Sequence, residues 1–139
     1  MGPAVVPPTP EIVTVRSGGL RSSIDLLREL DHDPAPLVLA SGLTLDVFQD
    51  PETEVPIGAA LRLLGSCVRT SGLLHFGVMA GGRNSLATLG LFGLYAQTAP
   101  DMRTAIYDLI AFLSVHDRFA EVRLKTGGET AILQYVFNY

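Results

Sequence analysis

Apolar residues recur at helical spacing in three segments of the chain. In residues 20–30 they fall every three or four positions, opposite charged residues, which predicts an amphipathic helix that stops before Pro34. Residues 57–70 predict a second helix that ends at Gly72. We expect this second helix to bury Ile57, Ala60, Leu61, Leu64 and Val68.

The third segment follows Pro100 and predicts the clearest helix of the chain. Asp101 suits the N-cap position, and its carboxylate would favour the positive end of the helix. We therefore expect a core helix with an unbroken apolar stripe of Met102, Ala105, Ile106, Leu109, Ile110 and Leu113.

Shorter patterns complete the expected fold. Residues 12–15 form a β-like run, and a Gly-containing helix is expected over 89–96. Two alternating runs, 121–126 and 129–139, flank Gly127-Gly128 and predict a β-hairpin turning at those glycines. Candidates for its sheet faces are Val122, Leu124, Ile132, Gln134 and Val136. Short helical pieces are expected at 35–40 and 44–48.

These elements predict the α+β class. We expect a single domain in which several helices pack with a small antiparallel sheet that includes the C-terminal hairpin. The first ten residues contain four prolines, so 1–10 is interpreted as a flexible leader and 11–139 as the domain. With 47% hydrophobic and 17% charged residues, a chain of 139 residues can bury a sizeable core.

Charge and cysteine content exclude several classes. The 10 basic residues are outnumbered by 14 acidic ones, which argues against direct DNA binding. Cys67 is the single cysteine, so the chain has no internal disulfide and no thiolate cluster for zinc. The N-terminus lacks the pattern of a signal peptide, and the longest uncharged stretch, 84–100, is too polar to span a membrane. We expect a cytoplasmic protein without membrane contact.

The residues offer little support for catalysis. The histidines lack the spacing of a metal site, and Cys67 lies on an apolar helix face where a thiol packs like a small hydrophobe. No nucleophile elbow, phosphate loop or dinucleotide motif is present in the sequence. We therefore expect no catalytic residue, no metal ligand and no cofactor.

Isolated polar residues within apolar segments indicate a small-molecule site instead. The turn of residues 81–85 could also cradle an anion with backbone amides and Arg83, although a solvated turn is the commoner explanation. For each polar residue the alternative is a buried hydrogen-bond partner or contact with water. The candidate ligand-binding residues are His75, Arg83, Tyr95, Gln97, Tyr107 and His116.

Several short motifs, taken in order, carry a family resemblance over about residues 20–137. The most specific are His75-Phe-Gly77, Leu89-Gly-Leu-Phe-Gly93 and Thr98-Ala-Pro100, followed by Ala105. In their order and spacing they resemble the arabinose-binding-like N-terminal regulatory domain of AraC-type bacterial transcriptional regulators. Asp101 departs from the pattern, because the family often has Thr there, but both residues are good N-caps.

The resemblance implies a domain that senses a small-molecule effector and often dimerises. In such regulators it precedes a DNA-binding domain with two helix-turn-helix motifs, which is missing from these 139 residues. The expected partners are an effector of unknown class, a second copy of the chain, and DNA only through the missing domain. Two alternatives stay open: a homodimerisation module without a ligand, and a small hydrolase or metal-dependent sensor that uses His75, His116 or Cys67.

Overall fold

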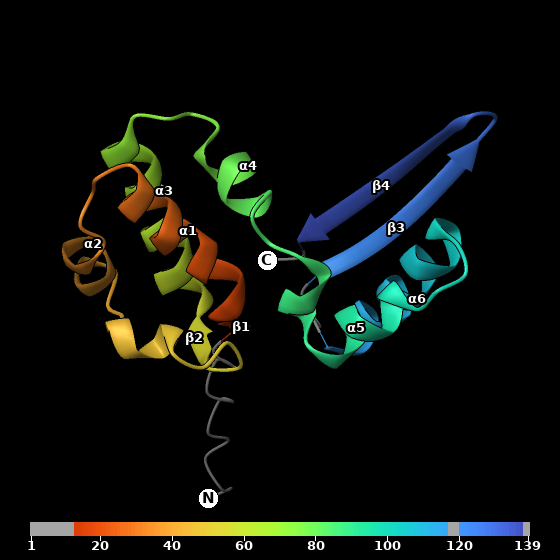
Figure 1. Cartoon of the computed structure of the whole chain (residues 1–139), viewed down its shortest axis with the longest axis horizontal. Coiled ribbons are helices and arrows are strands. Elements are labelled where there is room, and N and C mark those ends of the chain that lie inside the picture. The colour runs from red at the N-terminus through yellow and green to blue at the C-terminus, as the bar shows by residue number, and fades with distance from the viewer. Residues whose placement is uncertain (1–12, 117–119, 138–139) are drawn as a thin grey trace, which may run out of the picture. The chain divides into compact units, whose positions relative to one another are not determined.

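The computed structural model describes residues 13–116 and 120–137 (Figure 1). Within them, helices and two small antiparallel sheets form an α+β fold, which confirms the predicted class. The chain divides after Arg83 into two compact units, called unit 1 and unit 2. The expectation of a single domain over 11–139 stays a prediction.

Unit 1 is mainly helical, with one pair of short strands. Strand β1 pairs antiparallel with β2, and Val15 lies opposite the buried Val55. The β-like run predicted near residue 15 therefore finds its partner about forty residues later. In chain order the elements are β1 (Thr14–Arg16), α1 (Gly18–Glu29), α2 (Ala35–Ala40), the 3₁₀ helix η1 (Leu45–Phe48), β2 (Glu54–Pro56), α3 (Ile57–Ser71) and α4 (Phe76–Gly81).

The N-terminus of α1 is held by the loop that precedes β2. The backbone N–H of Ser17 donates to Thr53 O at 2.8 Å, and that of Gly18 donates to Pro51 O at 3.0 Å. The buried Ser17 hydroxyl donates to Asp50 O at 3.0 Å. Loop carbonyls thus satisfy donors at the start of the helix, where no side-chain cap is present.

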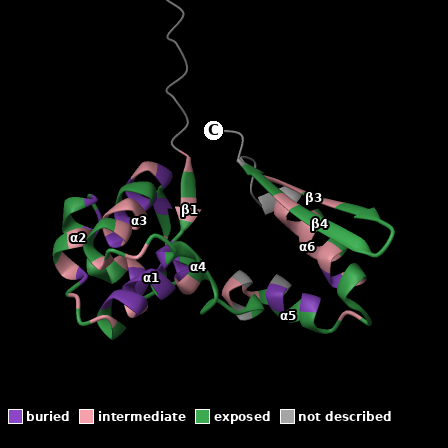
Figure 2. Ribbon diagram, turned by 90° about the horizontal axis from the view of Figure 1, so that it is seen from above, coloured by how far each residue is buried: buried purple, intermediate pink, exposed green. Residues whose placement is uncertain are grey.

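Helices α1 and α3 supply most of the core of unit 1. Leu20, Ile24 and Leu27, which belong to the regularly spaced apolar residues of the predicted amphipathic helix, are buried, and α1 packs against both α3 and α4. Figure 2 shows much of this helix as buried. Phe76 of α4, which is fully buried, belongs to the same apolar cluster.

The buried stripe of α3 differs from the predicted one. Leu61, predicted to lie in the core, is 54% exposed, whereas Leu63 and Cys67 are completely buried. Apolar residues of α3 cover more than one side of the helix, so spacing alone does not select the buried side. Packing against α1, α2 and α4 selects it, and Gly72 then ends the helix with a positive φ of 68°, as predicted.

Unit 2 consists of helices followed by a long hairpin. The helix expected over 89–96 is interrupted at Gly90, whose φ of 63° and ψ of −141° are not helical. A 3₁₀ turn therefore precedes a shorter α-helix. The elements are η2 (Leu86–Leu89), α5 (Leu91–Gln97), α6 (Met102–His116), β3 (Ala120–Gly127) and β4 (Thr130–Phe137).

Helix α6 begins as predicted, but its stripe is less buried than expected. Thr104 N donates to the Asp101 carboxylate at 2.8 Å, which confirms the N-cap, and this bond lowers the pKa of Asp101. Ala105 is buried, whereas Met102 is 75% exposed. The remaining predicted positions of the stripe are half-buried, because α5 and β3 pack against only part of the helix.

The predicted hairpin is present, with its turn one residue later than expected. Gly127 pairs with Thr130, so the two-residue loop is Gly128-Glu129 rather than Gly127-Gly128. Gly128 has a φ of 58°, a conformation that glycine adopts at no steric cost. The register places Val122 and Leu124 opposite Tyr135 and Leu133 on one face. The other face carries Ile132, Gln134 and Val136 opposite the charged side chains of β3.

The close approach of Gly18 to Pro51 generates a stability prediction. A Cβ at Gly18 would lie 2.9 Å from Pro51 Cβ and 3.0 Å from Pro51 O, so Gly18→Ala should lower the free energy of unfolding by about 1–3 kcal/mol. The matched control is Gly19→Ala, whose Cβ meets nothing within 4 Å and which should be neutral or stabilising by up to about 1 kcal/mol. Urea unfolding followed by circular dichroism measures both. Equal stabilities for the two variants would contradict the contact.

Candidate functional site

The six predicted ligand-binding residues are divided between the two units. His75 and Arg83 lie at opposite ends of α4 in unit 1, and both are exposed. Tyr95 and Gln97 lie on α5, two positions apart, so their side chains point to different sides of the helix. Tyr107, half exposed, and His116 belong to α6, and the His116 side chain lies outside the described part of the structure. Their ligand-binding role stays a prediction.

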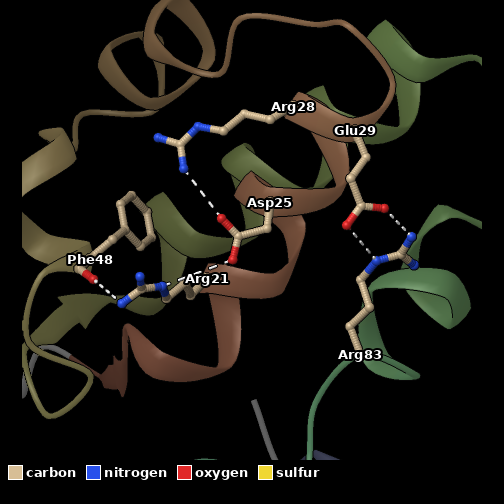
Figure 3. A network of polar contacts seen from close by, with 6 residues as sticks. All are labelled: Arg21, Asp25, Arg28, Glu29, Phe48 and Arg83. Atoms are coloured by element: carbon tan, nitrogen blue, oxygen red, sulfur yellow. Dashed lines mark hydrogen bonds and ion pairs between the residues drawn. The ribbon is translucent and has the colours of Figure 1, made fainter.

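Arg83 is the predicted site residue with the best-defined surroundings. Its guanidinium pairs with both carboxylate oxygens of Glu29, at the last position of α1, with N–O distances of 2.5 and 3.4 Å (Figure 3). Arg83 Nη1 also donates to Met79 O at 2.8 Å, near the C-terminal end of α4. One side chain thus joins the ends of two helices of unit 1.

This ion pair changes the interpretation of the turn at residues 81–85. The hydrogen bond with Arg83 holds the pKa of Glu29 below its ordinary value, and Glu29 raises the pKa of Arg83. An anionic ligand at Arg83 would have to compete with this carboxylate. Sequence reasoning missed Glu29, because 54 residues separate it from Arg83 and no local pattern relates them.

A second polar network lies on the exposed side of α1. Asp25 accepts from Arg28 at 3.2 Å and lies 3.9 Å from Arg21, which in turn donates to Phe48 O at 3.4 Å (Figure 3). The Arg21 contact joins η1 to α1. All three charged side chains of this network are about half exposed, so we assign the network to the protein surface rather than to a site.

Cys67 is a buried thiol inside the core of unit 1. Its side chain has no exposed surface and lies in the apolar cluster formed with α1 and α4. Burial raises the pKa of the thiol to about 11, so at neutral pH it is protonated. A protonated, inaccessible thiol is a poor nucleophile and a poor metal ligand.

Side chains that could bind a metal ion are dispersed in the described part of the chain. Among these residues, no three His, Cys, Asp or Glu side chains gather in a group that could hold such an ion. No helix in the described ranges has both the length and the apolar character that a bilayer crossing requires.

One family model matches the chain. It is described as the arabinose-binding domain of AraC transcription regulators, N-terminal, and it covers residues 32–138, well over half of the sequence. The match runs from the loop after α1 to the end of β4, so it includes parts of both units. No curated protein matches the chain.

Removing Arg83 should raise the pKa of Glu29. In Arg83→Gln the carboxylate loses the hydrogen bond that lowers its pKa, so the value should return toward 4.5. Because the pKa of Glu29 is lowered in the folded state, its ion pair with Arg83 stabilises the wild-type fold above pH 4.5, and this contribution is lost on acidification. The variant lacks the ion pair and should not show this loss. An NMR titration of Glu29 measures the shift. The control is Arg69→Gln, at an arginine that is hydrogen-bonded to Ser66, and it should leave the pKa of Glu29 unchanged. An unchanged pKa of Glu29 in Arg83→Gln would contradict the ion pair.

Cys67 should resist thiol reagents until the protein unfolds. At pH 8 we expect no labelling by a disulfide reagent in the native state and complete labelling in urea, since the thiol is buried. Stability should fall as the pH rises above 9, because the unfolded thiol ionises near 9.0 and the folded one only near 11. Cys67→Ala should lack this part of the pH dependence. Rapid stoichiometric labelling of the native protein would refute the burial.

Proposed function

Because the chain belongs to the family of arabinose-binding N-terminal domains of AraC transcription regulators, we propose that it binds a small-molecule effector and controls a separate DNA-binding domain. The family consists of ligand-sensing regulatory domains, and the match over residues 32–138 is the observation that carries the proposal. The net charge of −4 supports a separate DNA-binding domain, because a chain of this charge does not attract a phosphate backbone. DNA contact would come from the separate domain, in the cytoplasm.

The mechanism we propose is linkage between effector binding and the arrangement of the parent regulator. An effector that binds one arrangement more tightly shifts the population toward it by the ratio of its two affinities. No bond is made or broken in this process. The proposal therefore assigns no catalytic role to His75, His116 or Cys67.

The difference in burial between the units supports a binding role for unit 2. Core side chains of unit 1 such as Leu27, Leu63 and Phe76 are completely buried. In unit 2, Leu91 is 81% exposed and Tyr95 62% exposed. Binding sites for small molecules are mostly apolar with a few placed polar groups, and α5 carries both kinds of side chain, the exposed Leu91 and Tyr95 and the polar Gln97.

A ligand screen tests the proposal. We expect one class among sugars, amino acids, fatty acids and aromatic acids to raise the melting temperature saturably, because a ligand that binds only the native state stabilises it by mass action. Tyr95→Ala and Tyr107→Ala should weaken that ligand about tenfold, as expected for the loss of one aromatic contact. Arg69→Gln, in unit 1, is the control and should bind normally.

Control of DNA binding has to be tested in the intact regulator. Saturation with the same ligand should change its affinity for operator DNA. A ligand that saturates the chain but changes neither DNA affinity nor transcription would refute control of DNA binding. Flat melting temperatures across all four classes would refute effector binding and favour the alternative below.

A homodimerisation module without a small ligand is the second candidate. It is supported by the large apolar side chains that the hairpin exposes, among them Ile132 and Leu133, because exposed apolar patches mark association sites. Sedimentation velocity over a range of concentrations distinguishes the two candidates. A concentration-independent monomer would exclude this one.

A further inference from the structure

The sequence of α4 makes it a weak helix. Two of its six residues, Gly77 and Gly81, are glycines, and glycine in a helix is destabilising relative to alanine. Neither has a positive φ, and a Cβ at either position would meet no atom of the described residues within 4 Å. Neither packing nor backbone conformation therefore requires glycine here, and the two glycines make α4 easier to open.

Few side chains of α4 hold the helix against the rest of unit 1. Phe76, its first residue, is completely buried and Ala80 is buried, where α4 packs against α1 and α3. Val78 is 78% exposed, and Leu74, just before the helix, is 95% exposed. Within the described residues no side-chain hydrogen bond caps the start of α4. The largest apolar anchor therefore lies at the start of the helix.

Arg83 holds the other end of α4. It follows the helix by two residues, and its guanidinium contacts both Met79 O of α4 and the Glu29 carboxylate of α1 (Figure 3). The Arg83 side chain is 34% exposed and that of Glu29 56% exposed, so water and salt ions reach this ion pair. Such a contact can break while the apolar core of unit 1 stays intact.

Helix α4 is the last element of unit 1. The unit ends at Arg83 itself, and the chain then passes into unit 2. If the ion pair between Arg83 and Glu29 breaks, the residues that follow the buried Phe76 lose their polar attachment to α1. Unwinding of residues 77–83 would then lengthen the connection between the two units.

We propose that residues 77–83 form a local order–disorder switch, and that the ion pair between Glu29 and Arg83 is its latch. In the latched state these residues are ordered and attached to α1. In the open state they are a flexible connection, while Phe76 and the core of unit 1 keep their places. Elements that move in regulated proteins come from the least stable parts of a structure, and α4 has that character. The switch lies within unit 1 and does not depend on effector binding, so it goes beyond the proposed function.

Amide hydrogen exchange of the full chain tests whether α4 opens by itself. The amides of Met79 and Gly82 report on α4, because they donate to His75 O at 3.1 Å and to Val78 O at 2.9 Å. The amide of Leu27, which is fully buried in α1, is the reference for opening of unit 1 as a whole. We expect the two α4 amides to exchange about tenfold faster than the reference, or more. Equal rates would mean that α4 opens only with the whole unit, and would overturn the switch.

Removing either partner of the ion pair tests the latch. Arg83→Gln and Glu29→Gln should each speed exchange of the two α4 amides about twofold or more and leave the reference amide unchanged. Because the two side chains act together, the double variant should exchange no faster than Arg83→Gln. The matched control is Arg28→Gln, which removes an exposed ion pair with Asp25 on the same helix and should change none of the three rates. Unchanged α4 rates in both single variants, or a faster reference amide, would overturn the latch.

Replacing the glycines tests the weakness of the helix. Gly77→Ala combined with Gly81→Ala should slow exchange of the two α4 amides about tenfold, because alanine favours the helical state at both positions. The control is Gly19→Ala in α1, whose Cβ also meets nothing within 4 Å and which should leave the α4 amides unchanged. Unchanged α4 rates in the alanine variant, or equal slowing by the control, would overturn local opening of α4.

Discussion

The architecture of unit 1 depends on how the start of α1 is fixed. Backbone groups of Ser17 and Gly18 donate to loop carbonyls at Thr53 and Pro51, and Gly18 approaches Pro51 so closely that no side chain fits between them. This contact satisfies donors that a helix start leaves open, and it sets the direction in which α1 leaves the loop. Leu20, Ile24 and Leu27 then reach the core beside α3. A displaced helix start would move that whole stripe.

The two units differ in how much apolar surface they bury. In unit 1 a continuous cluster of apolar side chains from α1, α2, α3 and α4 excludes water. In unit 2 the described helices and hairpin leave several large side chains exposed, including Leu91, Met102 and Leu133. Hydrophobic burial is the dominant favourable contribution to folding, so the described side chains stabilise unit 1 more than unit 2. Exposed apolar groups are available for binding, which is why the proposals above place effector and partner binding in unit 2.

Cys67 and Arg83 have side chains that could react or bind a ligand, but both make contacts that hold unit 1 together. Cys67 is a core residue, whose burial keeps the thiol protonated. Arg83 pairs with Glu29 and with a carbonyl of α4, so its charge is already matched at the point where unit 1 ends. In a regulator that works by linkage, such contacts matter through the stability of one arrangement relative to another. The family supports that mode of action, since it consists of regulatory domains.

The sequence by itself determined the elements whose causes are local. Apolar spacing predicted α1, α3 and α6, the carboxylate of Asp101 predicted an N-cap, and the turn glycines predicted the hairpin to within one residue. The order of short motifs indicated the family. Only the tertiary structure decided which side of α3 is buried, where Leu61 is exposed and Cys67 is not, because an apolar surface wider than one stripe fits more than one packing. It also decided that Arg83 meets Glu29 and that β1 meets β2, since contacts between residues far apart in the chain leave no local pattern in the sequence.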